Sequence, residues 1–417
     1  LALCFRKIKH PPTSTHHGFY LNDTLRYPAI TICRNPPYKT KLFEKYGFID
    51  NKEIEISSTW NSFKFDQYTL QEFFNETTYT FREIFKLTAL DKKPENIEVS
   101  SLFALHYGRC FTITPKINSK RWGSEYGYFF VFSHTDTTNQ ESFIGGLSGF
   151  HVFIHDEVER FTEKSQQADM FKEYIYVEAG DGIQVNIKMH KYNQLPTSNN
   201  KCAPQNIYSK SRCVDDGVNK LITEAVGCST PWVPNEHLSS CKTFQQTKQI
   251  VDYSTPSIYL DRYLEQTQCA ERCNATTYTP FLQSIRAIPL PTAAIKIYFS
   301  TNLYTVMEEI AGYDWNALLA DLGGSLGFLL GLSVISMIGL AEELFSTIIK
   351  MKQNRKVNIE LNSKSSSEEN NKTDTFVKTE NMDNNTLQLK SGMKDCNLNS
   401  EFYPKKNNLQ IESNEKF

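Results

Sequence analysis

Hydrophobic and polar residues alternate over much of the chain, and this pattern predicts a strand-rich domain between residues 6 and 312. Short runs in which apolar and polar residues take turns are typical of half-buried strands. Such runs are found at Tyr27–Cys33, Gly127–Phe132, Phe150–His155, Tyr174–Val177, Ile183–Lys188 and Ile295–Phe299. We expect each of these runs to form a strand.

Two helix starts interrupt the strand pattern. Thr69 and Glu72 have the spacing of a capping box, in which a Thr and a later Glu satisfy backbone N–H groups at the start of a helix. Thr80 and Glu83 repeat this spacing. The sequence therefore predicts two short helices between about residues 70 and 87. Together with the strands, these helices indicate an α+β fold class.

A long apolar segment follows the strand-rich part. From Leu322 to Ala341 the chain carries no charge, and a helix of this length can cross a hydrocarbon core about 30 Å thick. Small and hydroxyl residues interrupt the segment at Gly323, Gly324, Ser325, Gly327, Gly331, Ser333, Ser336 and Gly339. Small residues let helix backbones approach each other closely. We expect a transmembrane helix within residues 313–349 that packs against other helices, either tightly or around water.

Basic residues and a polar tail come after this segment. The basic residues are Lys350, Lys352, Arg355 and Lys356. By the positive-inside rule they place this end of the segment in the cytoplasm, which leaves residues 6–312 outside the cell. The remaining chain is mainly Asn, Lys, Ser, Glu and Thr. Because this composition buries little apolar surface, we expect residues 350–417 to form a disordered cytoplasmic tail.

The first residues resemble the end of an apolar run. Residues 1–5 are apolar, and residues 6–9 are mostly basic. We expect residues 1–5 to be the remnant of a first transmembrane helix, so that the chain is truncated there. The alternative is a native amino end at Leu1.

Composition and charge exclude some classes of function. The net charge of −2 provides no basic excess for nucleic acid, and no nucleophile–base pattern of an enzyme is visible. Ten cysteines without a CxxC or HExxH motif favour disulfides in an oxidising compartment over a metal site. Cys4 and Cys396 lie in the apolar start and in the tail, and we expect both to be free.

Six cysteines form a cluster in the second half of the expected ectodomain. They are Cys202, Cys213, Cys228, Cys241, Cys269 and Cys273. Their spacing leaves the pairing open, but three bridges would stabilise a pair of helices whose own core is too small to hold alone. Three sequons begin at Asn22, Asn75 and Asn274. We expect these asparagines to be glycosylated, in line with an extracellular location.

Titratable residues gather in and after the run that ends at residue 155. His151 and His155 would lie on one face of the strand, which suits a metal or proton sensor or ordinary strand residues. Asp156, Glu157 and Glu159 either join an acid-sensing pocket or form a solvated loop.

Several motifs lie in an order that points to one family. They are Tyr27–Cys33, Gly108–Ile113, Gly149–Glu157, Cys228–Pro234, Cys269–Cys273 and Asp321–Ser336. This ordered set resembles the degenerin/epithelial sodium channel family over about residues 20–350. The family implies trimers whose subunits have two transmembrane helices and a disulfide-rich, hand-like ectodomain with a palm, a finger and a thumb (here about 202–285). It implies a sodium-selective, amiloride-sensitive channel of the plasma membrane.

The resemblance also implies roles for individual residues. Gly331, Leu332 and Ser333 occupy the position of the selectivity filter, where carbonyl and hydroxyl oxygens would replace part of the hydration shell of Na⁺. The gate and the pore would involve Ala320, Asp321, Gly323, Gly324, Gly327, Ser336, Glu342 and Glu343. The implied disulfides are Cys33–Cys110, Cys202–Cys273, Cys213–Cys269 and Cys228–Cys241.

The sequence departs from the family pattern at several points. The first transmembrane helix and the cytoplasmic His-Gly motif are missing from it. Gly339 stands where an acidic residue is usual, and Glu342 and Glu343 lie one turn further in. A cysteine pair that often precedes Gly108 and a Trp that often precedes the first thumb cysteine are absent, which puts the usual contact between thumb and membrane in doubt.

Other interpretations remain open. Gly323, Gly327 and Gly331 are spaced four apart and fit a GxxxG helix-packing seam. The chain could instead be a single-pass, disulfide-rich adhesion or receptor ectodomain that conducts nothing, or a subunit that is silent outside a heteromer. As a channel subunit it needs no cofactor. Its partners would be related subunits in a homo- or hetero-trimer, membrane lipid, Na⁺ and amiloride-type blockers, and no nucleic acid.

Overall fold

The computed structural model describes residues 6–8, 10–49, 53–135, 148–167, 170, 173–197, 201–204, 207–254, 265–330 and 334–364. They belong to two compact units, Leu1–Leu332 and Ser333–Phe417. Helix α10 (Val334–Lys364) is the described part of the second unit. The predictions for residues 1–5, Gly331–Ser333, Cys396 and the tail after residue 364 lie outside the described residues.

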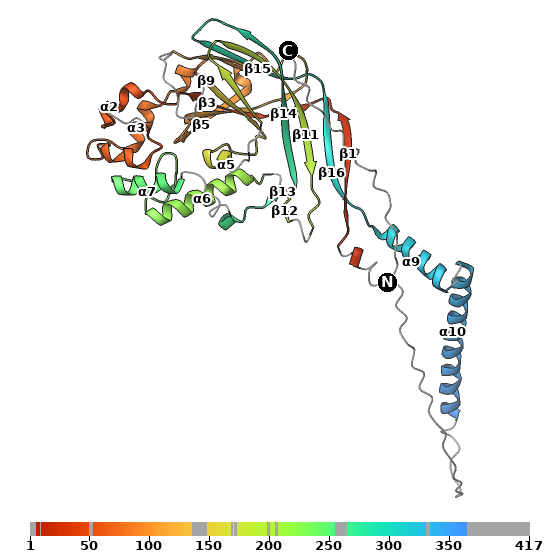
Figure 1. Cartoon of the computed structure of the whole chain (residues 1–417). Coiled ribbons are helices and arrows are strands. Elements are labelled where there is room, and N and C mark those ends of the chain that lie inside the picture. Colours follow the sequence, from red (N-terminus) through yellow and green to blue (C-terminus); the bar gives the residue numbers. More distant parts are fainter. Residues whose placement is uncertain are drawn as a thin grey trace, which may run out of the picture. The chain divides into compact units, whose positions relative to one another are not determined.

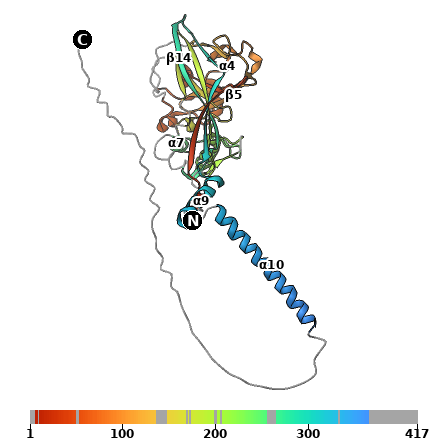
Figure 2. The ribbon, with the colours of Figure 1, turned by 90° about the vertical axis from the view of Figure 1, so that its right-hand side faces the viewer.

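The larger sheet of the first unit has seven strands. Its order is β1 (Thr13–Leu21), β16 (Leu303–Ala311), β11 (Asp181–Asn193), β15 (Thr292–Phe299), β8 (Tyr128–Ser133) and β4 (Phe85–Leu90), with β14 (Asn274–Ala287) also paired to β11. β11 pairs parallel with β15 and β16 and antiparallel with β14, so it organises the sheet. β1 and β16 can be followed side by side in both views (Figure 1 and Figure 2).

The second sheet has five strands and contains most of three motifs of the family resemblance, Tyr27–Cys33, Gly108–Ile113 and Gly149–Glu157. Its order is β10 (Tyr174–Glu178), β9 (Gly149–His155), β3 (Ala29–Asn35), β6 (Gly108–Pro115) and β5 (Ile97–Ala104). Short pairs add β2 (Leu25–Arg26) to β7 (Asn118–Ser119) and β12 (Cys202–Ala203) to β13 (Glu271–Arg272). All six strands predicted from alternation are confirmed, within a few residues at their ends.

One apolar core contains residues of both sheets. Phe132 of β8 and Phe150 of β9 stack with ring centroids 4.5 Å apart. Ile32 of β3 and Ile295 of β15 are fully buried in the same core. Many apolar positions of the predicted strands therefore face this core, and the alternation in β8 and β15 follows from the burial of one face. β3 and β9 are buried on both faces, and Phe153 of β9 packs in a separate cluster with the Cys33–Cys110 bridge.

Both predicted capping boxes are confirmed. Thr69 and Glu72 start α3 (Leu70–Thr77), and Thr80 and Glu83 start α4 (Phe81–Ile84). The second helix is shorter than predicted, because Phe85 is extended and pairs with Phe132 of β8. The remaining short helices of this half are η1 (Thr40–Leu42), α2 (Phe43–Tyr46), η2 (Ser57–Ser62) and η3 (Pro94–Asn96).

A second core joins these short helices to the predicted thumb. The longer helices are α6 (Lys210–Val226) and α7 (Phe244–Ser254), and α5 (Glu163–Gln167) is a short one. Trp232, between α6 and α7, stacks on Trp60 at 5.6 Å and on Phe74 at 5.1 Å. The thumb helices therefore share their core with α2, α3 and η2 (Figure 1). The three bridges predicted for this pair of helices are present, and a core shared with the neighbouring helices adds to them.

The segment predicted to cross the membrane, within residues 313–349, includes α9 (Trp315–Leu330) and the beginning of α10. Taken singly, none of the described helices combines the length and the apolar character that crossing a membrane requires. The transmembrane helix expected within residues 313–349 therefore stays a prediction.

Candidate functional site

Four disulfides stabilise the first unit, which contains most of the candidate site. They are Cys33–Cys110, Cys202–Cys273, Cys213–Cys269 and Cys228–Cys241, the same four pairs that the family resemblance implies. Cys33 and Cys110 lie directly opposite each other on β3 and β6, whereas the other three lie in or next to the thumb. Closing loops of this kind typically stabilises a fold by about 2–4 kcal/mol per bridge.

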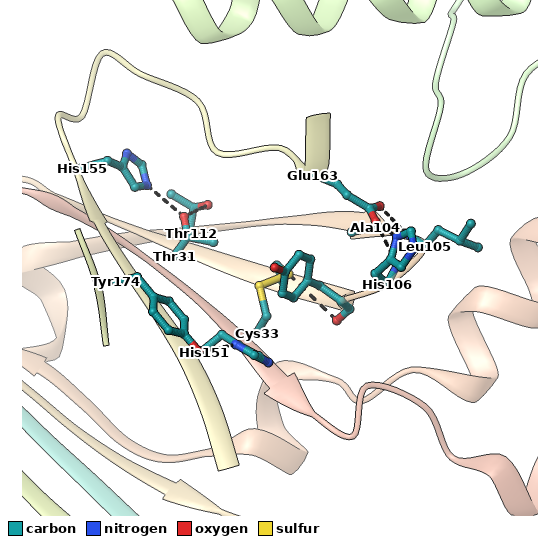
Figure 3. Close-up of a disulfide and its surroundings, with 12 residues drawn as sticks. Thr31, Cys33, Ala104, Leu105, His106, Thr112, His151, His155, Glu163 and Tyr174 are labelled. Carbon is teal, nitrogen blue, oxygen red and sulfur yellow. Dashed lines mark hydrogen bonds and ion pairs between the residues drawn. A yellow bond between two sulfur atoms is a disulfide. The ribbon is translucent and has the colours of Figure 1, made fainter. Parts of the chain in front are cut away.

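Two histidines lie on β9: His151 is opposite Cys33 of the Cys33–Cys110 bridge, and His155 lies further along the strand beside Thr31 (Figure 3). His151 Nδ1 is 2.8 Å from the Tyr174 hydroxyl, and burial lowers the pKa of His151 to about 4. His155 Nδ1 donates to the Asp156 carbonyl at 3.0 Å, so its Nε2 accepts from the Thr31 hydroxyl at 2.9 Å. Burial lowers the pKa of His155 as well. Both rings are therefore neutral near pH 7, and each has a hydrogen bond through Nδ1.

A metal site at these histidines would need further ligands close to them. Within the part of the chain that the structure describes, no three His, Cys, Asp or Glu side chains gather in a way that could hold a metal ion.

The acidic residues after β9 form ion pairs with two arginines. Asp156 is 3% exposed, and its Oδ2 accepts a hydrogen bond from Arg272 Nη1 at 2.7 Å. Its Oδ1 lies 4.0 Å from Arg26 Nη1, and Glu157 forms an ion pair with Arg26. The solvated-loop alternative is therefore wrong for Asp156, which is buried and paired.

Glu159 extends this network to the thumb. Its Oε2 accepts hydrogen bonds from the hydroxyls of Ser209 at 2.9 Å and Ser211 at 2.6 Å, and from the Ser211 N–H at 2.9 Å. Burial raises the pKa of Glu159, but these hydrogen bonds and the Arg272 charge outweigh burial and hold the pKa below its usual value. Glu159 is therefore ionised, and it fastens the start of α6 to the loop after β9.

A second buried pair connects the β5–β6 turn to α5. Glu163 accepts from the backbone N–H groups of Leu105 at 2.7 Å and His106 at 3.1 Å, and its carboxylate also contacts His106 Nδ1 (Figure 3). Burial lowers the pKa of His106, but the charge and hydrogen bond of Glu163 reverse the shift and raise it. Burial raises the pKa of Glu163, but the His106 charge and the hydrogen bonds from His106 and the two N–H groups outweigh burial. The pKa of Glu163 is therefore below its usual value.

The predicted gate and pore residues that are described lie on α9 and α10. Asp321 accepts a hydrogen bond from the Tyr313 hydroxyl at 2.8 Å. Side chains placed on Gly323, Gly324 or Gly339 would meet no atom of the described chain within 4 Å. The exposed side chains on these helices include those of Ala320, Ser336, Glu342 and Glu343. Gly327 is also on α9, and Gly331, Leu332 and Ser333 lie outside the described residues.

Residues 1–343 match the protein family described as "Amiloride-sensitive sodium channel". This chain belongs to that family. Acid-sensing ion channel 1B of Danio rerio is 22% identical over 380 residues, which cover 78% of this chain and 65% of that protein. Degenerin del-1 of Caenorhabditis elegans is 22% identical over 306 residues, which cover 62% of this chain and 44% of that protein. The chain thus spans less than two thirds of the length of either relative.

One solved structure is similar only at a low level. The cryo-EM structure of a proton-activated chloride channel aligns with 82% of this chain and 90% of that chain, at 6% identity and a TM-score of 0.31. A score this low supports no conclusion. Membership in the amiloride-sensitive sodium channel family rests on the sequence match, and because this family is one of ion channels, the prediction that the chain is not an enzyme is confirmed.

Several residues that form long-range ion pairs in this family member carry no local signal in the sequence. Arg272 is 116 residues from its partner Asp156, and Glu163 is 57 residues from His106. Glu55 was also missed, and burial raises its pKa to about 7. No local pattern marks such pairs, since their partners meet only after the strands have paired.

The three sequons lie on the surface. Asn22, Asn75 and Asn274 are exposed, and the Asn75 side-chain oxygen accepts a hydrogen bond from Arg109 Nη2 at 2.7 Å. That contact leaves the Asn75 nitrogen available for a glycan. Glycosylation of the three residues stays a prediction.

Proposed function

We propose that the chain is a subunit of a trimeric, sodium-selective and amiloride-sensitive cation channel of the plasma membrane. Its trimer would form with identical or related subunits, and it would carry Na⁺ passively across the lipid bilayer. The family match over residues 1–343 carries this proposal. The disulfide-rich first unit agrees with an ectodomain in an oxidising compartment.

The ion path would use the glycines and serines of the apolar segment. Backbone that leaves the helical form inside a membrane is tolerated only where protein or water satisfies it. Gly331, Leu332 and Ser333 are the proposed filter, because Gly permits a break in a helix and the Ser hydroxyl can satisfy the backbone groups that the break frees. Asp321 at one end of the segment, and Glu342 and Glu343 near the other, would attract cations and repel anions.

Replacing Ser333 by Trp is expected to reduce the preference for sodium over potassium sharply or to abolish the current. Three indole side chains would fill the ring in which three hydroxyls are proposed to contact the ion. The measurement is the reversal potential and the amiloride-sensitive current of the full-length protein in oocytes. Ser346→Trp on the exposed surface of α10 is the control, and surface labelling checks that both variants reach the membrane. A sodium preference unchanged in Ser333→Trp would exclude the filter assignment.

Replacing Asn22, Asn75 or Asn274 by Gln is expected to remove one glycan in each case. The three asparagines are exposed on the first unit, which the proposed topology places outside the cell. The measurement is the gel mobility of each variant before and after treatment with an N-glycosidase. If the wild-type protein does not shift on treatment, the assignment of residues 6–312 to the outside loses this support.

A further inference from the structure

The N-terminal segment and α9 are connected at one end of the long strand pair of the first unit. β1 and β16 pair antiparallel from Thr13 opposite Ala311 to Leu21 opposite Leu303. Next to the Thr13–Ala311 pair, the Gly312 N–H donates to the Pro12 carbonyl at 2.7 Å. Figure 1 shows the two strands running together toward α9. A displacement of β1 and β16 therefore reaches the start of α9 through only a few residues.

Tyr313 lies at this junction and contacts both sides of it. Its ring centroid is 5.4 Å from Lys7 Nζ, which belongs to the N-terminal segment. Its hydroxyl donates to Asp321 Oδ2 at 2.8 Å. Tyr313 is 9% exposed, and Leu318 in the first turns of α9 is 2% exposed. Tyr313 is thus a buried side chain whose hydroxyl is hydrogen-bonded to the Asp321 carboxylate, two turns into α9.

The first turn of α9 is fixed relative to Tyr313 by the next residue. Asp314 Oδ1 accepts from the Ala317 N–H at 2.8 Å, and its carbonyl accepts from the Leu318 N–H at 3.0 Å. This is the arrangement of an N-cap, which sets the direction in which a helix begins. The Tyr313–Asp321 bond closes the first two turns of the helix into one unit with the end of β16.

We propose that Tyr313 is a positioning residue that holds the Asp321 carboxylate toward the strand pair and passes movements of β1 and β16 on to the outer end of α9. The proposal rests on the proposed function, in which Asp321–Gly324 form the outer gate. A hydrogen bond to a carboxylate is roughly twice as strong as a neutral one. While the bond exists, one oxygen of Asp321 is occupied. When it breaks, the full charge becomes available to cations at the pore mouth.

Tyr313→Phe in the full-length channel tests the proposal, because it removes only the hydroxyl. The freed Asp321 carboxylate is expected to strengthen the block of sodium current by external Ca²⁺ and to shift the open probability about tenfold. Asp321→Asn combined with Tyr313→Phe is expected to remove this gain in Ca²⁺ block, because the carboxylate that causes it is then absent. A residue that only supported the fold would not produce a block that depends on the Asp321 charge.

Tyr304→Phe on β16 is the matched control, because Lys191 Nζ also lies over that ring, at 4.9 Å. It is expected to change neither the block nor the open probability. Wild-type behaviour of Tyr313→Phe would overturn the proposal. So would a double variant in which the separate effects of Tyr313→Phe and Asp321→Asn simply multiply.

A protein that carries no current would contradict the proposed function, and hydrogen exchange of the purified full chain then tests the contact by itself. Exchange over residues 315–321 is expected to rise in Tyr313→Phe and to stay unchanged in Tyr304→Phe. Equal exchange in all three proteins would show that the hydroxyl positions nothing.

Discussion

Replacing Arg272 by Met is expected to lower the free energy of unfolding of the first unit by about 3–5 kcal/mol. The Arg272 side chain is 9% exposed, and the side chain of Asp156 is 2% exposed. Removing the cation leaves Asp156 and Glu159 with uncompensated charges in a poorly solvated place, which is the costly way to break a buried ion pair. The measurement is the thermal or urea unfolding midpoint of the purified protein.

Arg26→Met is the matched control for this prediction. Arg26 pairs with the same loop through Asp156 and Glu157, but its side chain is 39% exposed. Pairs at exposed positions contribute about 0–1 kcal/mol, so we expect a small loss. Equal losses in the two variants would mean that burial does not decide the value of these pairs. A smaller loss for Arg272→Met than for Arg26→Met would contradict the network described above.

The contrast between the two arginines illustrates what the sequence could predict. Strands β8, β10, β11 and β15 were predictable because a more buried and a more exposed face leave a period of two in the apolar positions. β3 and β9 are buried on both faces and were predictable as short runs rich in apolar residues. The helices α3 and α4 were predictable because a capping box is a local interaction between Thr and Glu three residues apart. Both kinds of signal lie within a few residues of the chain.

Other strands leave no such signal. β1 is exposed along almost its whole length and contains the polar run Thr13–His17, yet it forms nine pairs with β16. Its conformation is fixed by backbone hydrogen bonds to a strand almost three hundred residues away, which no local pattern records. β14 is similarly exposed over its second half and is held by pairing with β11. Pairing, not burial, makes these segments strands.

The candidate site divides in the same way. The disulfide pairs followed from the family resemblance, since six clustered cysteines alone leave their pairing open. The ion pairs of Arg272 and Glu163 required the three-dimensional arrangement. The aromatic core around Trp60 and Trp232 also joins segments far apart in the sequence, so the thumb could not be recognised from sequence as part of a larger core.

The stability of the first unit is expected to fall as the pH rises from about 6.5 to 8. Below pH 6.5 the lowered pKa values of His151 and His155 act in the opposite sense, because the unfolded chain binds these protons more tightly than the folded protein does. The ordinary pKa of His106 is 6.5 and is raised in the folded protein, and that of Glu55 is raised from 4.5 to about 7. In both cases the folded protein binds the proton more tightly than the unfolded chain does. The stabilisation is therefore complete below the unfolded pKa and is lost as the pH passes through the folded one. For Glu55 the loss amounts to about 3 kcal/mol.

Glu163→Gln separates the two contributions. The amide keeps the shape of the side chain but loses the charge that raises the pKa of His106, so the part of the decline above pH 6.5 is expected to disappear. Glu55→Gln is expected to remove the part between pH 4.5 and 7 instead. The measurement is the unfolding temperature of each variant across this range. Glu163 itself acts in the opposite sense, because its lowered pKa adds stability above pH 4.5 that is lost in acid.

The wild-type protein should therefore be most stable near pH 6.5, between the acid losses of the Glu163, His151 and His155 contributions and the losses of Glu55 and His106 at higher pH. Glu224→Gln on the surface of α6 is the control, since its pair with Lys220 is exposed on both sides. We expect its curve to run parallel to that of the wild type. A wild-type unfolding temperature that rises steadily from pH 6.5 to 8 would show that Glu55 and His106 do not govern the pH dependence in this range.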